Sequence, residues 1–347
     1  MNEVHVIVPD GIDDPSRPSG GNSYDRRICA GLAAIGWTVH EHPAAGAWPA
    51  PDGAGRAAVA GVLAGIDDGS TVLIDGIIAS GVPDIAASQQ RLRVYVIMHM
   101  LRLGAVEATV LAGATGVIAT SRWTKAELIA RHALAGHRIH VVEPGVDAAG
   151  IAPGTALGTR LLCVAAVTPV KGHDVLVRAL AEVADLPWRC DCIGALDLDP
   201  GFVDRVRRRA ADGGIADRMR LVGARIGADL DAAYAAADLL VLCSRAETYG
   251  MVVTEALARG IPVIAPAVGG VPEALGGDGG RIAADDLPGI LVPPGDSAAL
   301  AAALRSWLGD AALQRRLRRA AQSRRATLAD WTRTAQRLSD VLAREAV

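Results

Sequence analysis

The stretch "DLLVLCSRAETYGMVVTEALARGIPVIA", residues 238–265, contains a strand, a helix and a second strand in succession. Its apolar runs at 239–243 and 262–265 are short, rich in Val, Leu and Ile, and predict buried strands. The segment between them predicts a helix at 251–259. Because neighbouring parallel strands are joined by such a crossover helix, the stretch predicts an α/β domain with a parallel sheet.

The same alternation of short apolar strands and helices runs along the whole chain. A first series of strands is predicted at 3–9, 37–42, 71–75, 93–99, 117–120 and 139–142, with helices that include 22–35, 83–90, 104–113 and 122–132. A second series of strands is predicted at 160–166, 188–193, 219–222, 239–243, 262–265 and 290–292, with helices near 172–185, 201–213, 229–237, 251–259 and 297–308. Two Arg-rich amphipathic helices are predicted within 310–346.

A segment rich in glycine and proline, 143–158, separates the two series and has no apolar periodicity. The sequence therefore predicts two Rossmann-like domains with a cleft between them. The N-terminal domain is predicted at 1–147, a linker at 148–158, the C-terminal domain at 159–328 and a final helix at 329–347. Ligands of open α/β sheets bind at the carboxyl ends of the strands.

Composition and charge exclude several classes of protein. The chain has 347 residues, of which 51% are hydrophobic, so it can bury two cores. A net charge of −3 gives no electrostatic case for nucleic-acid binding. No apolar stretch reaches the roughly 18 residues of a membrane span, and "MNEVHVIVPDG" predicts a strand rather than a signal peptide. We expect a cytoplasmic protein, although the Arg-rich segment 313–325 leaves a membrane-surface contact open.

Metal and disulfide signals are weak. The five cysteines show neither CxxC nor Cys/His zinc spacing, so we interpret them as small core residues in a reducing compartment. The acidic "DLD" at 197–199 has the spacing of a metal-binding motif, but it lies in a polar loop before Pro200 and is interpreted as surface. We expect no metal and no cofactor.

Two glutamates flank the loop between the first strand and the helix of the opening stretch. Glu247 precedes Thr248, Tyr249 and Gly250, and Glu255 follows eight positions after Glu247, which is roughly 12 Å along a helix. The predicted helix N-terminus attracts phosphate, and ionised carboxylates accept hydrogen bonds from hydroxyls. The arrangement suits a sugar–diphosphate–ribose. An N-terminal glutamate favoured by the helix dipole and an exposed mid-helix glutamate form the alternative.

Two further loops of the C-terminal half carry candidate ligand contacts. In "TPVKGHD", 168–174, Lys171 offers a cation for a diphosphate and Asp174 is a candidate helix cap. In "VGGVPEALGGDGG", 268–280, Gly269 and Gly270 permit close backbone approach to a ligand. The alternatives are a solvated lysine and an ordinary glycine turn.

The N-terminal half offers two more candidates. Gly20 and Gly21 precede the helix predicted near Asn22, a second anion-tolerant N-terminus. His99 ends a predicted strand, where it can donate to a hydroxyl or a phosphate, although a lone histidine is more often structural.

Together these loops resemble those of retaining glycosyltransferase family 4, which has the GT-B fold. The longest match is "SRAETYGMVVTEALARGIPVIAPAVGGVPE", 244–273, which looks like the family's E-x7-E signature followed by Gly-Gly-x-Pro-Glu. The segment "VTPVKGHDVLVRAL", 167–180, is similar to its donor-phosphate lysine loop, and "SGGNSYDRRICAGLAAIGW", 19–37, occupies the place of its N-terminal glycine loop. The resemblance covers nearly the whole chain. It implies that the C-terminal helix packs back on the N-terminal domain.

The resemblance also implies roles for the candidates. Lys171, Glu247 and His99 would be catalytic: the lysine offsets charge on the departing nucleoside diphosphate, and the other two contact the transferred sugar. The residues implied for donor binding are Thr248, Tyr249, Gly250, Glu255, Gly20, Gly21 and Arg225.

One departure from the family pattern concerns the diphosphate. The family pairs its lysine with an arginine, but Ala166 and Val170 stand at the corresponding positions here. Arg102 is the candidate phosphate partner, with Arg122 as a second choice. Because of this departure, the alternative that the protein is a weakly active or inactive relative stays open.

The implied reaction moves a sugar from a nucleoside diphosphate to an acceptor hydroxyl with retention of configuration. The partners are then a nucleotide-sugar donor and a small-molecule or glycan acceptor, and no metal is needed. A sugar-nucleotide-binding protein without turnover and a nucleotide-sugar epimerase are the rival functions. A nicotinamide dehydrogenase is disfavoured because the loop after the first strand lacks G-x-G-x-x-G spacing.

Overall fold

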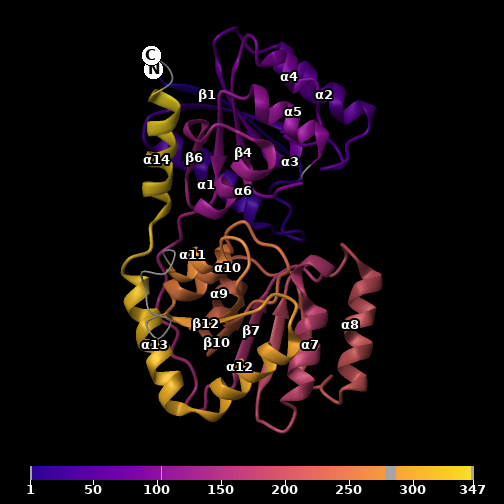
Figure 1. The fold of residues 1–347 in the computed structure, drawn as a ribbon, viewed down its shortest axis with the longest axis vertical. Coiled ribbons are helices and arrows are strands. Elements are labelled where there is room, and N and C mark those ends of the chain that lie inside the picture. The colour runs from indigo at the N-terminus through magenta and orange to yellow at the C-terminus, as the bar shows by residue number, and fades with distance from the viewer. Residues whose placement is uncertain (1, 103, 278–286, 345–347) are drawn as a thin grey trace. The chain divides into compact units, whose positions relative to one another are not determined.

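The computed structural model describes residues 2–102, 104–277 and 287–344. The chain forms two compact units (Figure 1). Unit 1 comprises Met1–Asp14, Ser19–Gly145 and Ala329–Val347, and unit 2 comprises Pro15–Pro18 and Val146–Leu328. Each unit contains one six-stranded parallel sheet with helices packed on it.

Unit 1 has the strand order β2-β1-β3-β4-β5-β6, and all of its described pairings are parallel. Its strands are β1 (Glu3–Pro9), β2 (Thr38–Ala44), β3 (Thr71–Asp75), β4 (Arg93–Met98), β5 (Gly116–Ala119) and β6 (Ile139–Val141). Its helices are α1 (Gly20–Ala34), α2 (Gly53–Ala64), α3 (Gly76–Ala79), α4 (Ile85–Ser88), α5 (Ala105–Gly113), α6 (Arg122–His132), the 3-10 turn η1 (Gly136–Arg138) and α14 (Trp331–Arg344).

Unit 2 has the strand order β12-β11-β10-β7-β8-β9, again with parallel pairings. Its strands are β7 (Arg160–Val164), β8 (Arg189–Ile193), β9 (Met219–Gly223), β10 (Leu239–Val241), β11 (Val263–Pro266) and β12 (Gly289–Val292). Its helices are the 3-10 turn η2 (Pro169–Lys171), α7 (His173–Glu182), α8 (Pro200–Asp212), α9 (Gly227–Ala235), α10 (Met251–Ala258), α11 (Val271–Leu275), α12 (Ser297–Gly309) and α13 (Ala311–Arg325).

The observed architecture confirms the predicted α/β class with two Rossmann-like sheets. Each predicted strand has an observed counterpart, with ends that shift by a few residues. The helix predicted at 83–90 is wrong in length, because α4 covers only Ile85–Ser88. Pro83 and Asp84 precede it in turn geometry, and Gln89 ends it.

Apolar side chains cover both faces of the unit 2 sheet. On one face, α7, α8 and α12 pack against β7 and β8 around Trp307, Leu176 and Phe202. On the other face, α9, α10 and α11 enclose Tyr234 and Leu257. Strands buried on both faces explain why the apolar runs read as continuous rather than alternating.

The cysteines are free thiols buried within the units, in agreement with their interpretation as core residues. Cys163 lies in β7, and Cys190 and Cys192 lie in β8. Cys243 was expected inside a strand, but β10 ends at Val241 and Cys243 belongs to the loop that follows.

The last helix of the chain, α14, packs on α1 within unit 1 (Figure 1). Its buried residues, Thr334, Ala335, Leu338, Ser339 and Leu342, form one helical stripe. The indole of Trp37 donates a 2.9 Å hydrogen bond to Ser339 Oγ. This placement agrees with a C-terminal helix that returns to the N-terminal domain.

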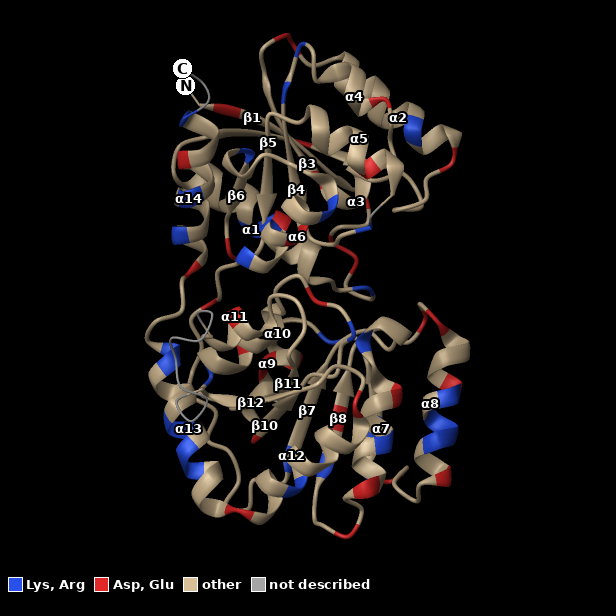
Figure 2. Ribbon diagram, viewed as in Figure 1, with Lys and Arg blue, Asp and Glu red and all other residues tan. Residues whose placement is uncertain are grey.

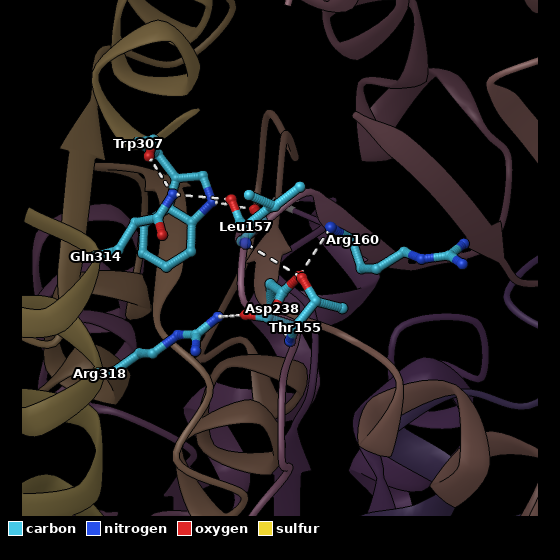
Figure 3. A network of polar contacts seen from close by, with 8 residues as sticks. Thr155, Leu157, Arg160, Asp238, Trp307, Gln314 and Arg318 are labelled. Carbon is cyan, nitrogen blue, oxygen red and sulfur yellow. Dashed lines mark hydrogen bonds and ion pairs between the residues drawn. The ribbon is translucent and has the colours of Figure 1, made fainter. Parts of the chain in front are cut away.

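The segment 148–158, predicted as a linker, contains no helix or strand and is bonded to unit 2. Figure 3 shows the network that holds it, which centres on the buried Asp238 before β10. Asp238 accepts hydrogen bonds from Thr155 N and Oγ1 at 2.5 and 2.6 Å and from Arg160 N at 2.9 Å. Arg318 of α13 donates to the same carboxylate at 2.6 Å. This carboxylate therefore joins the segment, β7 and α13.

Helix α13 carries a row of arginines, visible in Figure 2. Among the arginines with structural partners, Arg318 binds Asp238, Arg325 donates to Ala258 O, and Arg324 donates to Thr327 Oγ1. Among the described residues, no helix has both the length and the apolar character that crossing a bilayer requires.

Candidate functional site

Lys171 and Glu247 come from two different loops of unit 2 and meet directly. Lys171 Nζ lies 2.6 Å from Glu247 Oε1, and Ser244 Oγ donates to the same oxygen at 2.7 Å. The lysine side chain is 30% exposed and the glutamate 13% exposed. The pair is therefore partly exposed, and the lysine is its more accessible member.

Backbone contacts hold these two loops together. Arg245 N donates to Val170 O at 2.7 Å, and the Arg245 guanidinium donates to Pro169 O at 2.6 Å. Gly172 has a φ of +71°, and a Cβ at this position would lie only 1.9 Å from the carbonyl oxygen of Cys243. Only glycine tolerates that backbone and that approach. The lysine loop and the glutamate loop are therefore one structural piece.

Arg245 also forms a bidentate ion pair with Asp174, with both N···O distances at 2.8 Å. Burial raises the pKa of the Asp174 carboxyl, but the hydrogen bond and charge of Arg245 outweigh burial and lower it overall. Asp174 does not cap the helix as predicted. Helix α7 already begins at His173, so Asp174 lies in its first turn and binds the arginine instead.

Thr248, Tyr249 and Gly250 lead from Glu247 into α10. Gly250 is the N-cap residue, with φ +92°, and the helix proper starts at Met251. Gly270 N donates to Glu247 O at 3.1 Å, so the Gly269–Gly270 turn packs on the backbone of the glutamate loop. The predicted ligand loops thus converge around one helix N-terminus in unit 2. Residues 278–280, at the end of the glycine loop predicted at 268–280, lie outside the described residues.

Glu255, on α10, is held by a hydrogen bond and is not an exposed mid-helix residue. The Tyr234 hydroxyl donates to Glu255 Oε2 at 2.7 Å. Burial raises the pKa of Glu255, although the Tyr234 hydrogen bond and the Arg259 charge act in the opposite direction. Arg259 lies over the Tyr234 ring, 4.5 Å from its centroid. These contacts fix the position of one oxygen of the Glu255 carboxylate.

Replacing Tyr234 by phenylalanine should lower the free energy of unfolding by about 2 kcal/mol at pH 7, because a buried carboxylate loses its donor. Burial disfavours the charged form of Glu255. The loss of the Tyr234 hydrogen bond therefore destabilises the protein above the pKa of Glu255, and this destabilisation is relieved as the pH falls and the carboxylate is protonated. The deficit should therefore shrink between pH 7 and pH 5, as measured by urea unfolding. In a Glu255→Gln background the same change should show no pH dependence. A deficit in the single variant that is equal at both pH values would contradict this account.

The N-terminal candidates gather at the start of α1 in unit 1. Gly20 and Gly21 form its first turn, with Ser19 as the N-cap residue. His99 follows β4, and its imidazole packs on Gly21. His99 Nε2 lies 2.7 Å from Asp25 Oδ1. The two glycines and the histidine were predicted from the sequence as candidates, but the aspartate was not.

The candidates Arg102 and Arg225 lie on exposed loops, whereas Arg122 is the first residue of α6. Arg102, in unit 1, is exposed, and its backbone NH donates to Glu107 Oε2 at 3.0 Å. Arg225, in unit 2, is exposed and pairs with Asp229 at 3.2 Å. Val170, where the family arginine is expected, is 43% exposed. The role of either arginine stays a prediction.

Two groups of side chains in the described residues are compact enough to consider for a metal: Cys163, His173 and Cys192, and Asp25, Asp75 and His99. The first group is fully buried in the unit 2 core. In the second, the short contact between His99 and Asp25 is a hydrogen bond, which needs a proton rather than an ion. The predicted surface role of "DLD" agrees with its contacts, since Asp199 caps α8 and Asp197 pairs with Arg17.

Residues 158–310 match the family model described as "Glycosyl transferases group 1". The chain is 34% identical over 259 residues to a D-inositol 3-phosphate glycosyltransferase of Salinispora tropica, and 33% identical over 253 residues to one of Catenulispora acidiphila. These matches span 68% and 67% of this chain but only 52% and 58% of the two relatives, so the chain covers about half of their length.

Residues 158–310 belong to the glycosyltransferases group 1 family. Solved GT-B structures resemble this chain over 99% of its length. They include a sucrose-phosphate synthase from Thermosynechococcus elongatus, with a TM-score of 0.80 and 22% identity over 99% of that chain. Anabaena HepE, solved with UDP and glucose, has a TM-score of 0.79 and 19% identity over all of that chain. At this level of identity the two structures support the fold alone.

Three side chains that lie beside the candidate residues of the two units were not predicted from the sequence. Tyr234 gives no motif, because it reads as an ordinary apolar helix residue. Asp75 ends the apolar strand "TVLID", and Asp25 shares the apolar helix face of Ile28 and Leu32. A charged residue on an apolar stripe was the available signal for Asp25.

Proposed function

We propose that this protein is a retaining glycosyltransferase that moves a sugar from a nucleoside diphosphate sugar to an acceptor hydroxyl without a metal. The observation that carries the proposal is the 2.6 Å pair of Lys171 and Glu247 at the start of α10. A cation, a carboxylate and a helix N-terminus in one place provide complementary partners for a diphosphate and for sugar hydroxyls.

In this proposal, the donor diphosphate draws the ammonium of Lys171 away from Glu247. Lys171 and the first amides of α10 then offset the negative charge that grows on the departing nucleoside diphosphate. Glu247, relieved of its salt bridge, accepts hydrogen bonds from the sugar. Glu255, with one oxygen held by Tyr234, accepts from the ribose. The exchange gives each charged group a partner in both states.

The proposal assigns no side-chain base. In a retaining transfer the leaving oxygen and the acceptor hydroxyl share one face of the sugar. The departing phosphate oxygen therefore takes the proton of the acceptor as the new glycosidic bond forms. His99 of unit 1 is assigned to an oxygen of the substrate, with Gly20 and Gly21 beside it. We assign acceptor contacts to loops around 12–26, 76–82 and 99–103, of which Leu103 lies outside the described residues.

The relatives suggest which acceptors and donors to test first. The matched curated proteins are named for transfer to D-inositol 3-phosphate, so a polyol phosphate is our first acceptor class. HepE was solved with UDP-glucose, so uridine nucleotides are our first donor class. We place the reaction in the cytoplasm, where nucleotide sugars are available.

A thermal-shift screen with UDP, GDP, ADP, TDP and their sugars tests the donor assignment. A ligand at about 100 times its Kd should stabilise the folded protein by about 2.7 kcal/mol, which raises its Tm. Product analysis with an acceptor panel that includes inositol phosphate then tests transfer, and an anomer that matches the donor supports retention. Binding without transfer or hydrolysis would favour an inactive relative. Donor conversion without any acceptor would favour an epimerase.

A further inference from the structure

A buried ionic cluster in unit 1 lies behind the first turn of α1. It consists of Asp25 on α1, Asp75 at the end of β3 and His99 after β4, with their polar atoms within 4.8 Å of one another. Asp25 and Asp75 are 1% and 3% exposed, whereas the His99 side chain is 13% exposed. Of the three side chains, the imidazole is therefore the one that a ligand can reach.

The hydrogen bonds of the cluster leave one oxygen in need of a proton donor. His99 Nε2 bonds Asp25 Oδ1, while Asp25 Oδ2 is buried and has no hydrogen-bond partner in the part of the chain that the structure describes. Asp75 Oδ1 accepts from Ile77 N at 2.8 Å, which leaves its Oδ2 to carry a proton. Two neighbouring buried carboxyl groups rarely ionise together. A proton held between Asp25 and Asp75 therefore suits the geometry.

The electrostatics agree with this arrangement. Burial and the negative charge of Asp25 raise the pKa of Asp75 to about 7. Burial opposes a charge on His99, but the charge and hydrogen bond of Asp25 outweigh it, and the pKa of His99 rises to about 9. Tyr24, a further titratable neighbour, keeps its proton because burial and Asp25 raise its pKa well above 10. Near neutral pH the imidazole is thus protonated, and ionisation of Asp75 above about pH 7 strengthens that charge.

Helix α1 also fixes the orientation of the ring. A Cβ on Gly21 would lie 3.2 Å from His99 Cγ and Cδ2, so glycine allows the ring to rest on the backbone. The Tyr24 ring contacts the imidazole edge-on at 5.1 Å, and its hydroxyl is held by Val142 O at 3.0 Å. Gly21, Tyr24 and Asp25 share one helix face. One face of α1 thus sets both the position and the charge of His99.

We propose that Asp25 and Asp75 are positioning residues that keep His99 as an imidazolium, so that it donates hydrogen bonds to a phosphate or hydroxyl oxygen of the substrate. The inference rests on the proposed function, which assigns His99 to the substrate. Because Nε2–H is committed to Asp25, the protonation state decides the character of Nδ1. It is an acceptor in the neutral ring and a donor in the imidazolium. The two aspartates therefore select oxygen acceptors over hydroxyl donors as ligands of His99.

Histidine-detected NMR of the full chain tests the charge directly. Long-range 1H–15N spectra are recorded from pH 5.5 to 9.5, and His99→Asn identifies the resonance. We expect His99 to carry protons on both nitrogens at pH 7.5 in the wild-type protein. Asp25→Asn should lower its pKa by at least one unit and Asp75→Asn by less, while the control Asp13→Asn, at an exposed carboxylate paired with Arg26, leaves it unchanged. A neutral His99 at pH 7.5 in the wild-type protein, or an unchanged pKa in Asp25→Asn, would overturn the proposal.

The pH profile of sugar transfer separates a charge role from a merely structural one. In Asp25→Asn, transfer relative to the wild-type protein should fall about 10-fold between pH 6 and pH 8, because His99 loses its proton in that range. A loss that is equal at every pH would contradict the charge role. Failure of the proposed function would show as no transfer by the wild-type protein with any donor, whereas failure of this inference would show in the wild-type histidine spectra.

Discussion

Replacing Lys171 by alanine should lower the rate of sugar transfer by at least about 100-fold, which is the usual cost of removing an electrostatic stabiliser of the transition state. Lys171 is the cation that contacts Glu247, and we assign it to the departing diphosphate. The lysine is partly exposed, so its loss should leave the fold intact. Glu247→Ala should cause a loss of similar size, because the sugar loses its acceptor and Lys171 loses its partner. Initial rates at saturating donor measure both effects.

A matched control comes from α7. Arg178 is a cation on that helix, 45% exposed and 3.6 Å from Asp174. Arg178→Ala should transfer sugar at close to the wild-type rate. Lys171→Ala with unchanged turnover and unchanged Tm would remove Lys171 from the mechanism and with it our assignment of the diphosphate.

The largest effect on stability should come from Asp238→Ala. The side chain is buried and accepts from Thr155, Arg160 N and Arg318, so alanine leaves several buried donors unpaired (Figure 3). Removing one partner of a buried ion pair costs about 3–5 kcal/mol. For a unit of this size, even the lower figure lowers the Tm by roughly 6–12 °C. Differential scanning calorimetry should show the shift in the transition of unit 2.

The exposed pair of Asp185 and Arg305 provides the comparison, with two hydrogen bonds at 2.8 Å. Its geometry matches that of a strong salt bridge, but solvent screens both charges. Asp185→Ala should leave the calorimetric transition where it is. Equal shifts for the two variants would mean that burial is not what makes Asp238 important.

The fold was largely predictable because buried parallel strands leave a simple signal. Runs such as "TVLID" and "RLLCV" are apolar on both faces, and glycines or prolines separate them from the helices. Ends were less predictable. β10 stops at Val241 although Leu242 and Cys243 are also apolar, because the chain must turn there to bring Ser244 to Glu247. Helix α2, "GAGRAAVAGVLA", was not predicted, and its three glycines are residues that weaken a helix signal.

The candidate functional residues were likewise predictable only in part. Lys171 and Glu247 were predicted as separate ligand contacts from their loops, and the structure brings them together because those loops follow β7 and β10, which pair in the sheet. The residues that pair with these charged side chains were not predictable from the sequence around each of them. Tyr234 reaches Glu255 from another helix, and Arg245 takes Asp174 through a contact between residues 71 positions apart. Such pairings depend on the packing of elements and not on any motif.

The packing of α14 on α1 has a consequence for folding during translation. During synthesis residues 1–145 emerge first, yet the surface of α1 that receives Ala335 stays uncovered until α14 has been translated. All the strands of unit 2 are translated in the meantime, so the sheet of unit 2 is complete before unit 1 receives its last helix. The surface of α1 that α14 covers therefore stays exposed until α14 has been translated. This is the helix that bears Gly21 and Asp25.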